Sequence, residues 1–444
     1  MIFRHRAGNR IGKRTLNIGI LTIGDELTNG RIRDANAPWI AARLYRMGWN
    51  IPVIMTVGDT AEAIGRAIDS LSSQCRAVIV TGGLGPTPDD ITVEAVAKAC
   101  GRRLIRNDLV LASLRERTEA CGYRWTEGHR RQALIPEGAD VIPNPVGSAW
   151  GFSLNHRGCL FIVLPGVPEE AERMVADQAI PLLKRITPVS PAFVASRTLK
   201  CFGMPESEME ERIRGLIPEN GEVLAGFYPR FPEVHLVLTA RHPRKAEAEE
   251  NLRRVETAVS EILNPCLFGR DEETLEGIVG SLLTRKALTL AVAESCTGGL
   301  IADRLTDVPG SSLYLERGAV TYSNASKTAL LDVPEAILAE FGAVSEPTAR
   351  RMAEGIRNAA GVDLGLSTTG IAGPTGAVPG KPVGTVYIAL ASASGTICRH
   401  CLFHRDRRKV KVAAAHTALM MLREHLLYLR QLSVPLREGT AGVP

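Results

Sequence analysis

The sequence predicts an α/β protein in which two larger α/β domains, the first of them doubly wound, are joined by a small α+β domain. Three observations support this prediction. Apolar runs of strand length alternate with amphipathic runs of helix length at both ends of the chain, as in a parallel sheet covered by helices. A proline-punctuated connector, TPVSPAF, interrupts the alternation. The 444 residues also exceed the length of one ordinary domain.

The same patterns give the expected limits of each part. We expect a disordered basic tail over 1–16, an α/β domain over 17–186, an α+β domain over 192–266, a second α/β domain over 271–430 and a flexible tail over 431–444. The first tail has arginines but no apolar signal core, and its lack of acids leaves a transit peptide open.

Composition excludes several classes of protein. With 45% hydrophobic and 23% charged residues the chain resembles a soluble globular protein, and its net charge of +5 does not favour a nucleic-acid partner. Nine scattered cysteines without a double CxxC spacing indicate reduced thiols in a cytosolic enzyme. No apolar run approaches the roughly 20 residues of a membrane helix. We therefore expect a cytoplasmic protein that binds neither nucleic acid nor membrane.

Local signals predict each element of the first domain. Strands are expected at NIGILTI, IPVIMTVG and AVIV, and helices at APWIAARLYRMG, TAEAIGRAIDSLS and ITVEAVAKAC. Asn36, followed by Ala37 and Pro38, marks a helix start, and Asp59 with Glu62 forms a capping box. Because ligands bind at the carboxyl ends of strands in such sheets, the loops after NIGILTI and AVIV are the expected binding site.

These two loops differ in chemistry. The first, GDELTNGRIRDAN, carries three acids close to a strand end. In the second, TGGLGPTPDD, glycines let the backbone approach a ligand, and the helix that begins near Ile91 offers N–H groups to phosphate. Asp89 and Asp90 either cap that helix or hold a divalent cation that bridges to phosphates. Acids in two loops at one sheet edge raise the odds of a metal site.

The motifs TIGDELTNGRIRDAN and VIVTGGLGPTPDDIT resemble the MoaB/MogA type of molybdopterin-binding domain found at the front of the CinA (competence/damage-inducible) family. NPVGSAWGF and LPGVPEEAERM resemble later motifs of that domain. The family usually has Gly-Thr-Ala-Pro-Gly where this chain has Gly147-Ser148-Ala149-Trp150-Gly151, so a bulky ring replaces a proline beside the expected ligand.

The resemblance implies a nucleotide- or pterin-like ligand in this cleft and, in some members, an ADP-ribose pyrophosphatase activity that needs a divalent metal. The residues expected to bind the ligand are Gly24, Asp25, Glu26, Asp34, Asn36, Thr81, Gly82, Gly83, Gly85, Pro86 and Thr87. The expected metal ligands are Asp89 and Asp90.

The middle of the chain is expected to be a spacer or a dimerisation module. Strands are predicted at SRTLKCFG and EVHLVLTAR, and helices at PESEMEERIRGLI and RKAEAEENLRRVETAVSEIL. This segment contains no constellation of acid, base and nucleophile. GMPESEMEERI and YPRFPEVHLVLTAR resemble the interdomain segment of the CinA family.

In the last domain, four loops between predicted strands and helices are expected to converge. They are Ser295–Gly299, Tyr322–Lys327, Thr369–Lys381 and His404–Arg408. The long glycine- and proline-rich third loop is typical of a functional loop. Its Thr369, Gly370 and Gly373 are expected to shape one wall of a pocket, and Lys381 to contact an anion.

Ser295 follows a predicted buried strand in the sequence AESCTGG. The serine can be a nucleophile, a phosphate-binding hydroxyl or a helix cap, and two adjacent glycines favour a role beyond capping. The N–H groups of Thr297, Gly298 and Gly299 can stabilise an oxyanion or a phosphate. A serine nucleophile needs a base, for which Lys327 and Tyr322 are the candidates. A lysine has an ordinary pKa of ~10.4, so burial or a nearby cation must lower this pKa before the lysine can act as a base near neutral pH.

The segments AESCTGG, GAVTYSNASK, GAVSEPTARRMAEG and TGIAGPTGAVPGKPVGTV resemble the C-terminal CinA domain, the nicotinamide mononucleotide (NMN) amidohydrolase family. The resemblance now covers nearly the whole chain. It implies that NMN is hydrolysed to nicotinate mononucleotide and ammonia, in pyridine nucleotide salvage, without metal or other cofactor. Asn324 joins the expected substrate-binding residues, and Arg407 or Lys381 would hold the ribose phosphate by a charge-assisted contact.

The resemblance also implies a homodimer or higher homo-oligomer whose ligands are small nucleotides, NMN and ADP-ribose. Two other interpretations stay open. The protein can be a non-catalytic nucleotide- or pterin-binding regulator, or ADP-ribose cleavage can be its principal activity.

Overall fold

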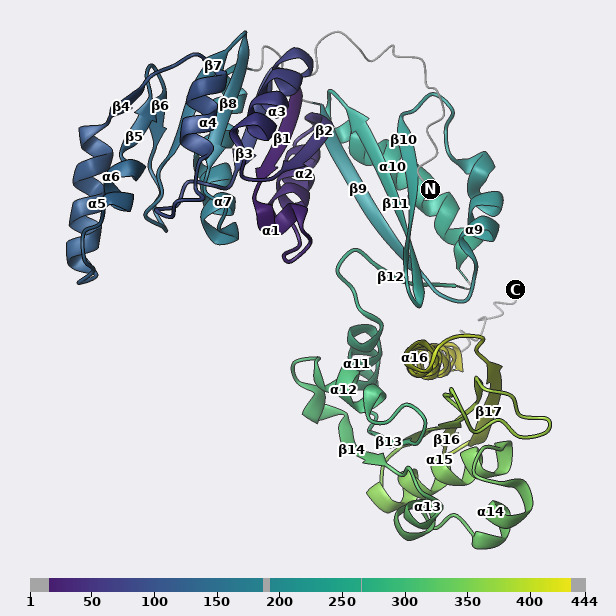
Figure 1. The fold of residues 1–444 in the computed structure, drawn as a ribbon. Helices are drawn as coiled ribbons and strands as arrows, with labels where there is room; N and C mark the ends of the chain where they lie inside the picture. The colour runs from purple at the N-terminus through teal and green to yellow at the C-terminus, as the bar shows by residue number, and fades with distance from the viewer. Residues whose placement is uncertain (1–15, 187–191, 265, 433–444) are drawn as a thin grey trace, which may run out of the picture.

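The computed structural model describes residues 16–186, 192–264 and 266–432, which form three units, each built around its own sheet (Figure 1). The expected tails over 1–16 and 431–444 lie outside the described residues, apart from Leu16 and the helix end at 431–432. No helix in the three described ranges combines the length and apolarity needed to span a membrane.

The first unit has a six-stranded sheet in the order β2-β1-β3-β8-β7-β6. Its strands are β1 (Asn17–Ile23), β2 (Asn50–Val57), β3 (Ala77–Thr81), β6 (Asp140–Ile142), β7 (Gly151–His156) and β8 (Cys159–Leu164). Its helices are α1 (Asp25–Thr28), α2 (Asn36–Arg46), α3 (Ala61–Gln74), α4 (Thr92–Ala99), α7 (Pro168–Met174), the π-helical η1 (Val175–Ala179) and α8 (Ile180–Ile186). Two separate apolar clusters flank the sheet, so helices cover both of its faces.

The sheet is mixed rather than wholly parallel. Strands β2, β1, β3 and β8 are parallel, but β7 is antiparallel to β8, and the edge strand β6 is antiparallel to β7. The cause is a two-residue turn, Arg157-Gly158, whose positive φ angles of 49° and 77° match the tight hairpin turn that the twist of paired strands favours. An insertion between β3 and β6 carries a small antiparallel pair, β4 (Leu104–Arg106) and β5 (Leu134–Pro136), with α5 (Asp108–Ala120) and α6 (Glu127–Gln132).

The expected capping box at Asp59 and Glu62 is wrong. Thr60 caps α3, because its side chain accepts the Ala63 N–H. The Asp59 carboxylate instead accepts the Asp25 N–H at 2.7 Å, and the Asp59 N–H donates to the Asp25 carboxylate at 3.0 Å. These reciprocal contacts tie the loop after β1 to the loop after β2.

The middle unit is an antiparallel sheet in the order β10-β11-β9-β12. Its elements are β9 (Phe193–Cys201), α9 (Glu206–Ile213), the 3-10 turn η2 (Arg214–Leu216), β10 (Val223–Arg230), β11 (Glu233–His242), α10 (Lys245–Leu263) and β12 (Leu267–Arg270). The apolar stripe of α10 packs on one sheet face, where Leu252, Val255 and Val259 join Leu199 and Leu236 in one buried cluster. Strand β10, which the sequence did not predict, forms the sheet edge.

The last unit has a five-stranded sheet in the order β14-β13-β15-β16-β17. Its strands are β13 (Leu290–Glu294), β14 (Leu315–Val320), β15 (Leu364–Gly370), β16 (Thr385–Ser392) and β17 (Gly395–Leu402). Its helices are α11 (Leu275–Lys286), α12 (Leu300–Thr306), the 3-10 turn η3 (Ser311–Leu313), α13 (Asn324–Leu331), α14 (Glu335–Phe341), α15 (Glu346–Ala360) and α16 (Arg407–Leu432). Figure 1 shows α16 and α15 in this unit, which is drawn from green to yellow.

Strands β14, β13 and β15 are parallel neighbours, so their carboxyl ends meet at one edge of the sheet. Glu294, the last residue of β13, pairs with Val320 of β14 and Thr368 of β15. The loops that follow these strands therefore begin side by side. This register explains why segments more than 70 residues apart in the sequence can build one site.

Two glycines inside helices should respond to alanine in opposite ways. At Gly355 of α15 a Cβ atom would lie 1.9 Å from the Leu331 carbonyl oxygen, whereas at Gly65 of α3 no atom lies within 4 Å. We predict that Gly355→Ala lowers the thermal unfolding midpoint, since forced overpacking costs about 1–3 kcal/mol. Gly65→Ala should raise it slightly, since alanine in a helix gains about 1 kcal/mol. Scanning calorimetry checks both, and unchanged unfolding of Gly355→Ala would contradict the close packing.

Candidate active site

The first element of the site is the buried strand β13 and its last residue, Glu294. The Glu294 carboxylate accepts the N–H groups of Ile301 at 3.1 Å and of Ala302 at 2.9 Å. Glu294 therefore caps α12, and Ser295 does not. Gly298 and Gly299 have φ angles of 60° and 92°, a region that glycine adopts without strain. The chain can thus turn back so that Glu294 reaches the helix while Ser295 remains at the strand end.

Ser295 lies against Lys327. The Lys327 Nζ is 3.2 Å from the Ser295 Oγ, 2.8 Å from the Thr321 carbonyl oxygen and 3.3 Å from the Tyr322 carbonyl oxygen. Ser323 caps α13 by accepting the Ser326 N–H, which fixes the first turn that carries Lys327. The Lys327 side chain is 1% exposed and Ser295 is 8% exposed, so both reacting groups are largely removed from water.

Burial lowers the pKa of Lys327 from its ordinary value, because the charged form loses its hydration. The two carbonyl oxygens can only accept hydrogen bonds, and a neutral amine has two N–H bonds and one lone pair. In its neutral form, an amine that gives both N–H bonds to the Thr321 and Tyr322 carbonyl oxygens has its lone pair left for the Ser295 hydroxyl. This arrangement is that of a base beside a serine nucleophile.

The turn after Ser295 offers hydrogen-bond donors. Thr297 is buried, and its hydroxyl lies 2.7 Å from that of Thr368 on β15. Across the described ranges, no acceptor is found for the backbone N–H groups of Thr297, Gly298 and Gly299. Free N–H groups beside a nucleophile are what an oxyanion or a phosphate requires.

Tyr322 and Arg407 link the other predicted loops. The Arg407 guanidinium donates to the Tyr322 hydroxyl at 3.0 Å and to the Gly373 carbonyl oxygen at 2.7 Å. Tyr322 is 62% exposed, and its backbone carbonyl, not its hydroxyl, contacts Lys327. The geometry therefore favours Lys327 over Tyr322 as the base that accepts the Ser295 proton.

The other residues predicted to bind substrate either make contacts that stabilise the fold or make no contact with the turn after Ser295. The buried Thr369 hydroxyl donates to the Ala343 carbonyl oxygen at 2.6 Å, and Lys381 donates to that of Phe341 at 2.7 Å. A Cβ atom at Gly370 would lie 2.7 Å from the Thr385 carbonyl oxygen, so this glycine permits close packing. Asn324 is exposed at the start of α13. No contact in the described structure joins Lys381 or Asn324 to the turn after Ser295.

Lys411 is a residue that the sequence interpretation missed. A Cβ atom at Gly298 would lie 3.2 Å from the Lys411 Nζ, so this ammonium lies directly over the turn. The side chain is half-buried, and within the described residues it has no hydrogen-bond or ion-pair partner. The available signal was its spacing from Arg407, since residues four apart lie on one helix face.

The first unit contains a second candidate site, a pocket of about 540 Å³ at the carboxyl ends of β1 and β3. We call it the acidic pocket, because its lining includes Glu26, Asp34, Asp59, Asp89, Asp90 and Glu170. Of the residues predicted to bind a ligand here, those that line it are Gly24, Glu26, Asp34, Asn36, Thr81, Gly82, Gly83, Gly85 and Pro86. Asp25 and Thr87 do not line it, but they hydrogen-bond to two residues that do, Asp59 and Asp90 respectively.

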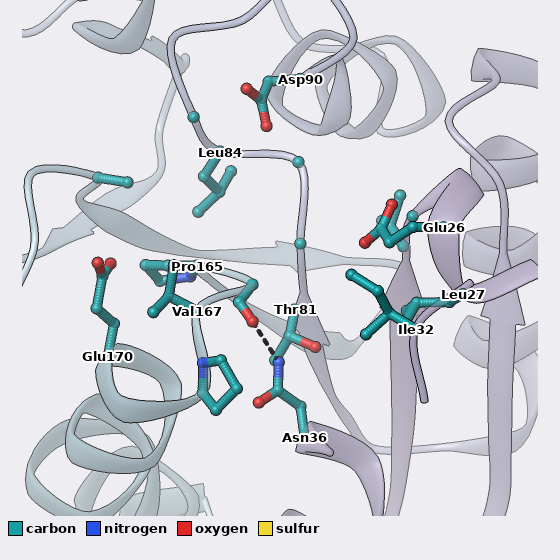
Figure 2. Close-up of a pocket in the computed structure, with 18 of the residues that line it drawn as sticks. Glu26, Leu27, Ile32, Asn36, Thr81, Leu84, Asp90, Pro165, Val167 and Glu170 are labelled. Carbon is teal, nitrogen blue, oxygen red and sulfur yellow. Dashed lines mark hydrogen bonds between the residues drawn. The ribbon is translucent and has the colours of Figure 1, made fainter. Parts of the chain in front are cut away.

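Three buried polar atoms of residues that line the acidic pocket lack partners in the described structure: the Asn36 Oδ1, the Thr81 Oγ1 and the Gln132 Oε1. Figure 2 shows Asn36 beside Thr81, with Glu26 and Glu170 on opposite sides of them. The Asn36 Nδ2 donates to the Gly166 carbonyl oxygen at 2.8 Å, which orients the amide. Because unpaired buried polar atoms are costly, these three are available to hydrogen-bond a ligand.

The acids of this pocket include two that the sequence interpretation did not assign to it, Asp59 and Glu170. Burial and the charges of Asp25, Glu26 and Asp89 raise the pKa of Asp59. The Glu170 carboxylate accepts the Asn144 side-chain N–H at 2.7 Å. Asp90 accepts both the N–H and the hydroxyl of Thr87. Among the described residues, no group of three or more acid, histidine or cysteine side chains is arranged to share a metal ion.

The expectation that the Trp150 ring lies beside the ligand is wrong. Ser148 and Ala149 line the acidic pocket, but Trp150 does not. Its ring packs with Leu111, Trp125 and Val141 against the small core beneath α5. Apolar surface on the insertion therefore draws the ring away from the pocket.

Known families match all three units. The C-terminal unit matches the CinA C-terminal domain over residues 272–426, the first unit a probable molybdopterin binding domain over 19–185, and the middle unit the damage-inducible protein CinA KH domain over 196–269.

Similar proteins extend over nearly the full chain. A CinA-like protein of Syntrophus aciditrophicus (strain SB) is 54% identical over 412 residues, which are 93% of this chain and 98% of that protein. A CinA-like protein of Geotalea uraniireducens (strain Rf4) is 43% identical over 94% of this chain and 100% of its own. Among solved structures, the competence/damage inducible protein CihA from Agrobacterium tumefaciens is 38% identical and covers 34% of this chain and 95% of its own, with a TM-score of 0.33.

Proposed function

This chain belongs to the CinA family, and we propose that its C-terminal domain, over residues 271–430, hydrolyses the carboxamide of NMN to nicotinate mononucleotide and ammonia. The observation that carries the proposal is the 3.2 Å contact between the Ser295 Oγ and the buried Lys327 Nζ. A serine beside an amine of lowered pKa is an activated nucleophile. The free N–H groups that follow it are suited to the negative oxygen formed when a carbonyl is attacked.

In the proposed reaction, the Ser295 Oγ attacks the carboxamide carbon while its proton passes to neutral Lys327. The N–H groups of Thr297 to Gly299 bind the oxyanion of the tetrahedral intermediate. Lys327 then returns the proton to the nitrogen as the C–N bond breaks, so ammonia leaves and an ester to Ser295 remains. Water hydrolyses this ester, with Lys327 taking a proton from the water and restoring the serine. No step uses a metal or another cofactor.

The contacts of three cations, Lys381, Arg407 and Lys411, indicate which of them is free to position the substrate. Lys381 already donates to the Phe341 carbonyl oxygen, and Arg407 to Gly373 and Tyr322. Lys411 lies over Gly298 without a partner among the described residues. We therefore assign the main phosphate contact of NMN to Lys411, with Arg407 on the same helix face beside it.

Replacing the serine or the lysine tests the chemistry. We predict that Ser295→Ala and Lys327→Met each lower kcat for ammonia release by about 10²–10⁴-fold, the usual contribution of a positioned base, while NMN still binds. For the unaltered protein, kcat/KM should rise with pH as Lys327 loses its proton, with a midpoint below 10.5, because burial lowers the pKa of this lysine. Ammonia release and NMN titration measure these effects.

Lys409→Met is the matched control, because Lys409 is exposed and pairs with Asp406 at 2.9 Å. If Ser295→Ala weakened NMN binding and left turnover intact, the serine would be a phosphate ligand. The alternative class, a non-catalytic binding regulator, requires that no ammonia be released by any variant.

Lys411 can be tested separately from the chemistry. Lys411→Ala should raise KM for NMN by roughly 10- to 100-fold with little change in kcat, since a hydrogen bond to a charged group is worth about 1.5–3 kcal/mol. Nicotinamide riboside, which lacks the phosphate, should be hydrolysed equally by this variant and by the unaltered protein. An equal loss on both substrates would contradict a phosphate contact.

The acidic pocket supports a second proposed function, cleavage of ADP-ribose with a divalent metal in the domain over 17–186. The unpaired Asn36 Oδ1 and Thr81 Oγ1 favour a ligand rich in hydrogen-bond donors. Carboxylate oxygens suit a hard cation such as Mg²⁺, which keeps several waters and is often completed by substrate phosphates. Asp89 and Asp90 would hold it, and the metal would supply positive charge to the phosphates.

Asparagine at both positions tests this second function. The double variant Asp89→Asn with Asp90→Asn should lower the rate of metal-dependent ADP-ribose cleavage by at least ~10²-fold, since a bound cation stabilises developing charge by several kcal/mol. Ammonia release from NMN should stay unchanged, because the two sites lie in different units. Loss of both activities would contradict independent sites, and full activity with a chelator would contradict a metal.

A further inference from the structure

A second hollow, of about 690 Å³, adjoins the acidic pocket on the insertion between β3 and β6. We call it the arginine hollow, after Arg106, Arg115, Arg130 and Arg131. These arginines come from β4, α5 and α6, which Figure 1 shows grouped at the end of the first unit away from β2. Neither the amidohydrolase reaction nor the proposed metal-dependent cleavage uses this hollow.

The two neighbouring hollows have opposite charge. The lining of the acidic pocket includes six carboxylates and one arginine, Arg33. The lining of the arginine hollow includes four arginines and one carboxylate, Glu127. An anionic group is therefore repelled by the first and attracted by the second. Guanidinium groups also match phosphate geometry through paired N–H donors.

Three of the four arginines of this hollow, Arg106, Arg115 and Arg130, are available to a ligand. Arg106 pairs with Asp108 at 2.9 Å and Arg130 with Glu127 at 3.2 Å, but these arginine side chains are 67% and 63% exposed. Ion pairs with such exposure contribute little to stability, so a phosphate can replace the carboxylates. Arg115 lies over the Trp125 ring, with 5.6 Å to the ring centre, which holds its guanidinium at the hollow.

The two hollows share one lining residue. Pro86, at the end of the glycine-rich loop, lines both of them. Helix α6 is fastened to this loop, because Arg131 donates to the Thr87 carbonyl oxygen and Gln132 to that of Leu84 at 3.0 Å. Gly128 permits the approach, since a Cβ atom there would lie 2.4 Å from the Pro86 carbonyl oxygen. The wall between the hollows is therefore a fixed part of the fold.

We propose that the arginine hollow is a phosphate subsite for a nucleotide that lies across Pro86. In the metal-free protein its nucleoside part occupies the acidic pocket, where Asn36 and Thr81 offer acceptors, and its phosphate groups contact Arg106, Arg115 and Arg130. This binding mode is distinct from the metal-bound phosphates of the proposed ADP-ribose cleavage. Each added phosphate then strengthens binding. This inference does not depend on the amidohydrolase proposal.

Calorimetric titration of the full chain in the presence of a chelator tests the subsite, with inorganic pyrophosphate, adenosine, AMP and ADP as the probes. The affinity should increase from adenosine to AMP to ADP, and pyrophosphate should bind alone. The double variant Arg106→Gln with Arg130→Gln should bind pyrophosphate and ADP at least ~10-fold more weakly, because charge-assisted contacts are lost. Its affinity for adenosine should not change.

Arg66→Gln is the matched control, since Arg66 is exposed on α3 and lines neither hollow. Thermal unfolding of the double variant should equal that of the unaltered protein, because only exposed ion pairs are broken. Pyrophosphate that fails to bind the unaltered protein, or that binds the double variant with unchanged affinity, would overturn the proposal. An Arg66→Gln variant that bound pyrophosphate and ADP as weakly as the double variant would also overturn it.

Discussion

The burial of one lysine is the constraint on which the proposed chemistry depends. Lys327 is removed from water, and carbonyl oxygens rather than a carboxylate receive its N–H groups. An acid at this position would pair with the ammonium and keep the proton on it. The fold places the nearby acid, Glu294, on the N–H groups of α12 instead. Lys327 can therefore face Ser295 as a neutral amine.

Sheet topology supplies the rest of the site. The parallel register of β14, β13 and β15 brings three strand ends together, and α16 returns to add Arg407 and Lys411 above them. The first unit also has its candidate site at the carboxyl ends of parallel strands, since the acidic pocket lies where β1 and β3 end. The two sites nevertheless differ in charge. The Lys411 cation lies over the turn after Ser295, whereas carboxylates line the acidic pocket, so the sites suit different parts of nucleotide chemistry.

Much of this could be predicted from the sequence, because strand periodicity and glycine-rich turns are local signals. The α/β class and the strand that ends at Glu294 are of this kind, and most of the residues predicted to bind a ligand in the first unit line the acidic pocket. What was missed depends on contacts distant in sequence. The Trp150 ring packs against an apolar cluster beneath α5. Asp59 bonds to Asp25 instead of capping α3. Lys411 and the arginine hollow likewise appear only when separate elements pack together.

The most direct test of the central claim is to trap the ester on Ser295. The protein is mixed with NMN and quenched in acid within the first turnover. It is then digested, and the peptide masses are measured by mass spectrometry. We expect the peptide containing Ser295 to gain the mass of NMN less ammonia, and Lys327→Met to form none of this adduct. Ammonia release at the full rate from Ser295→Ala, or an adduct on another residue, would contradict it.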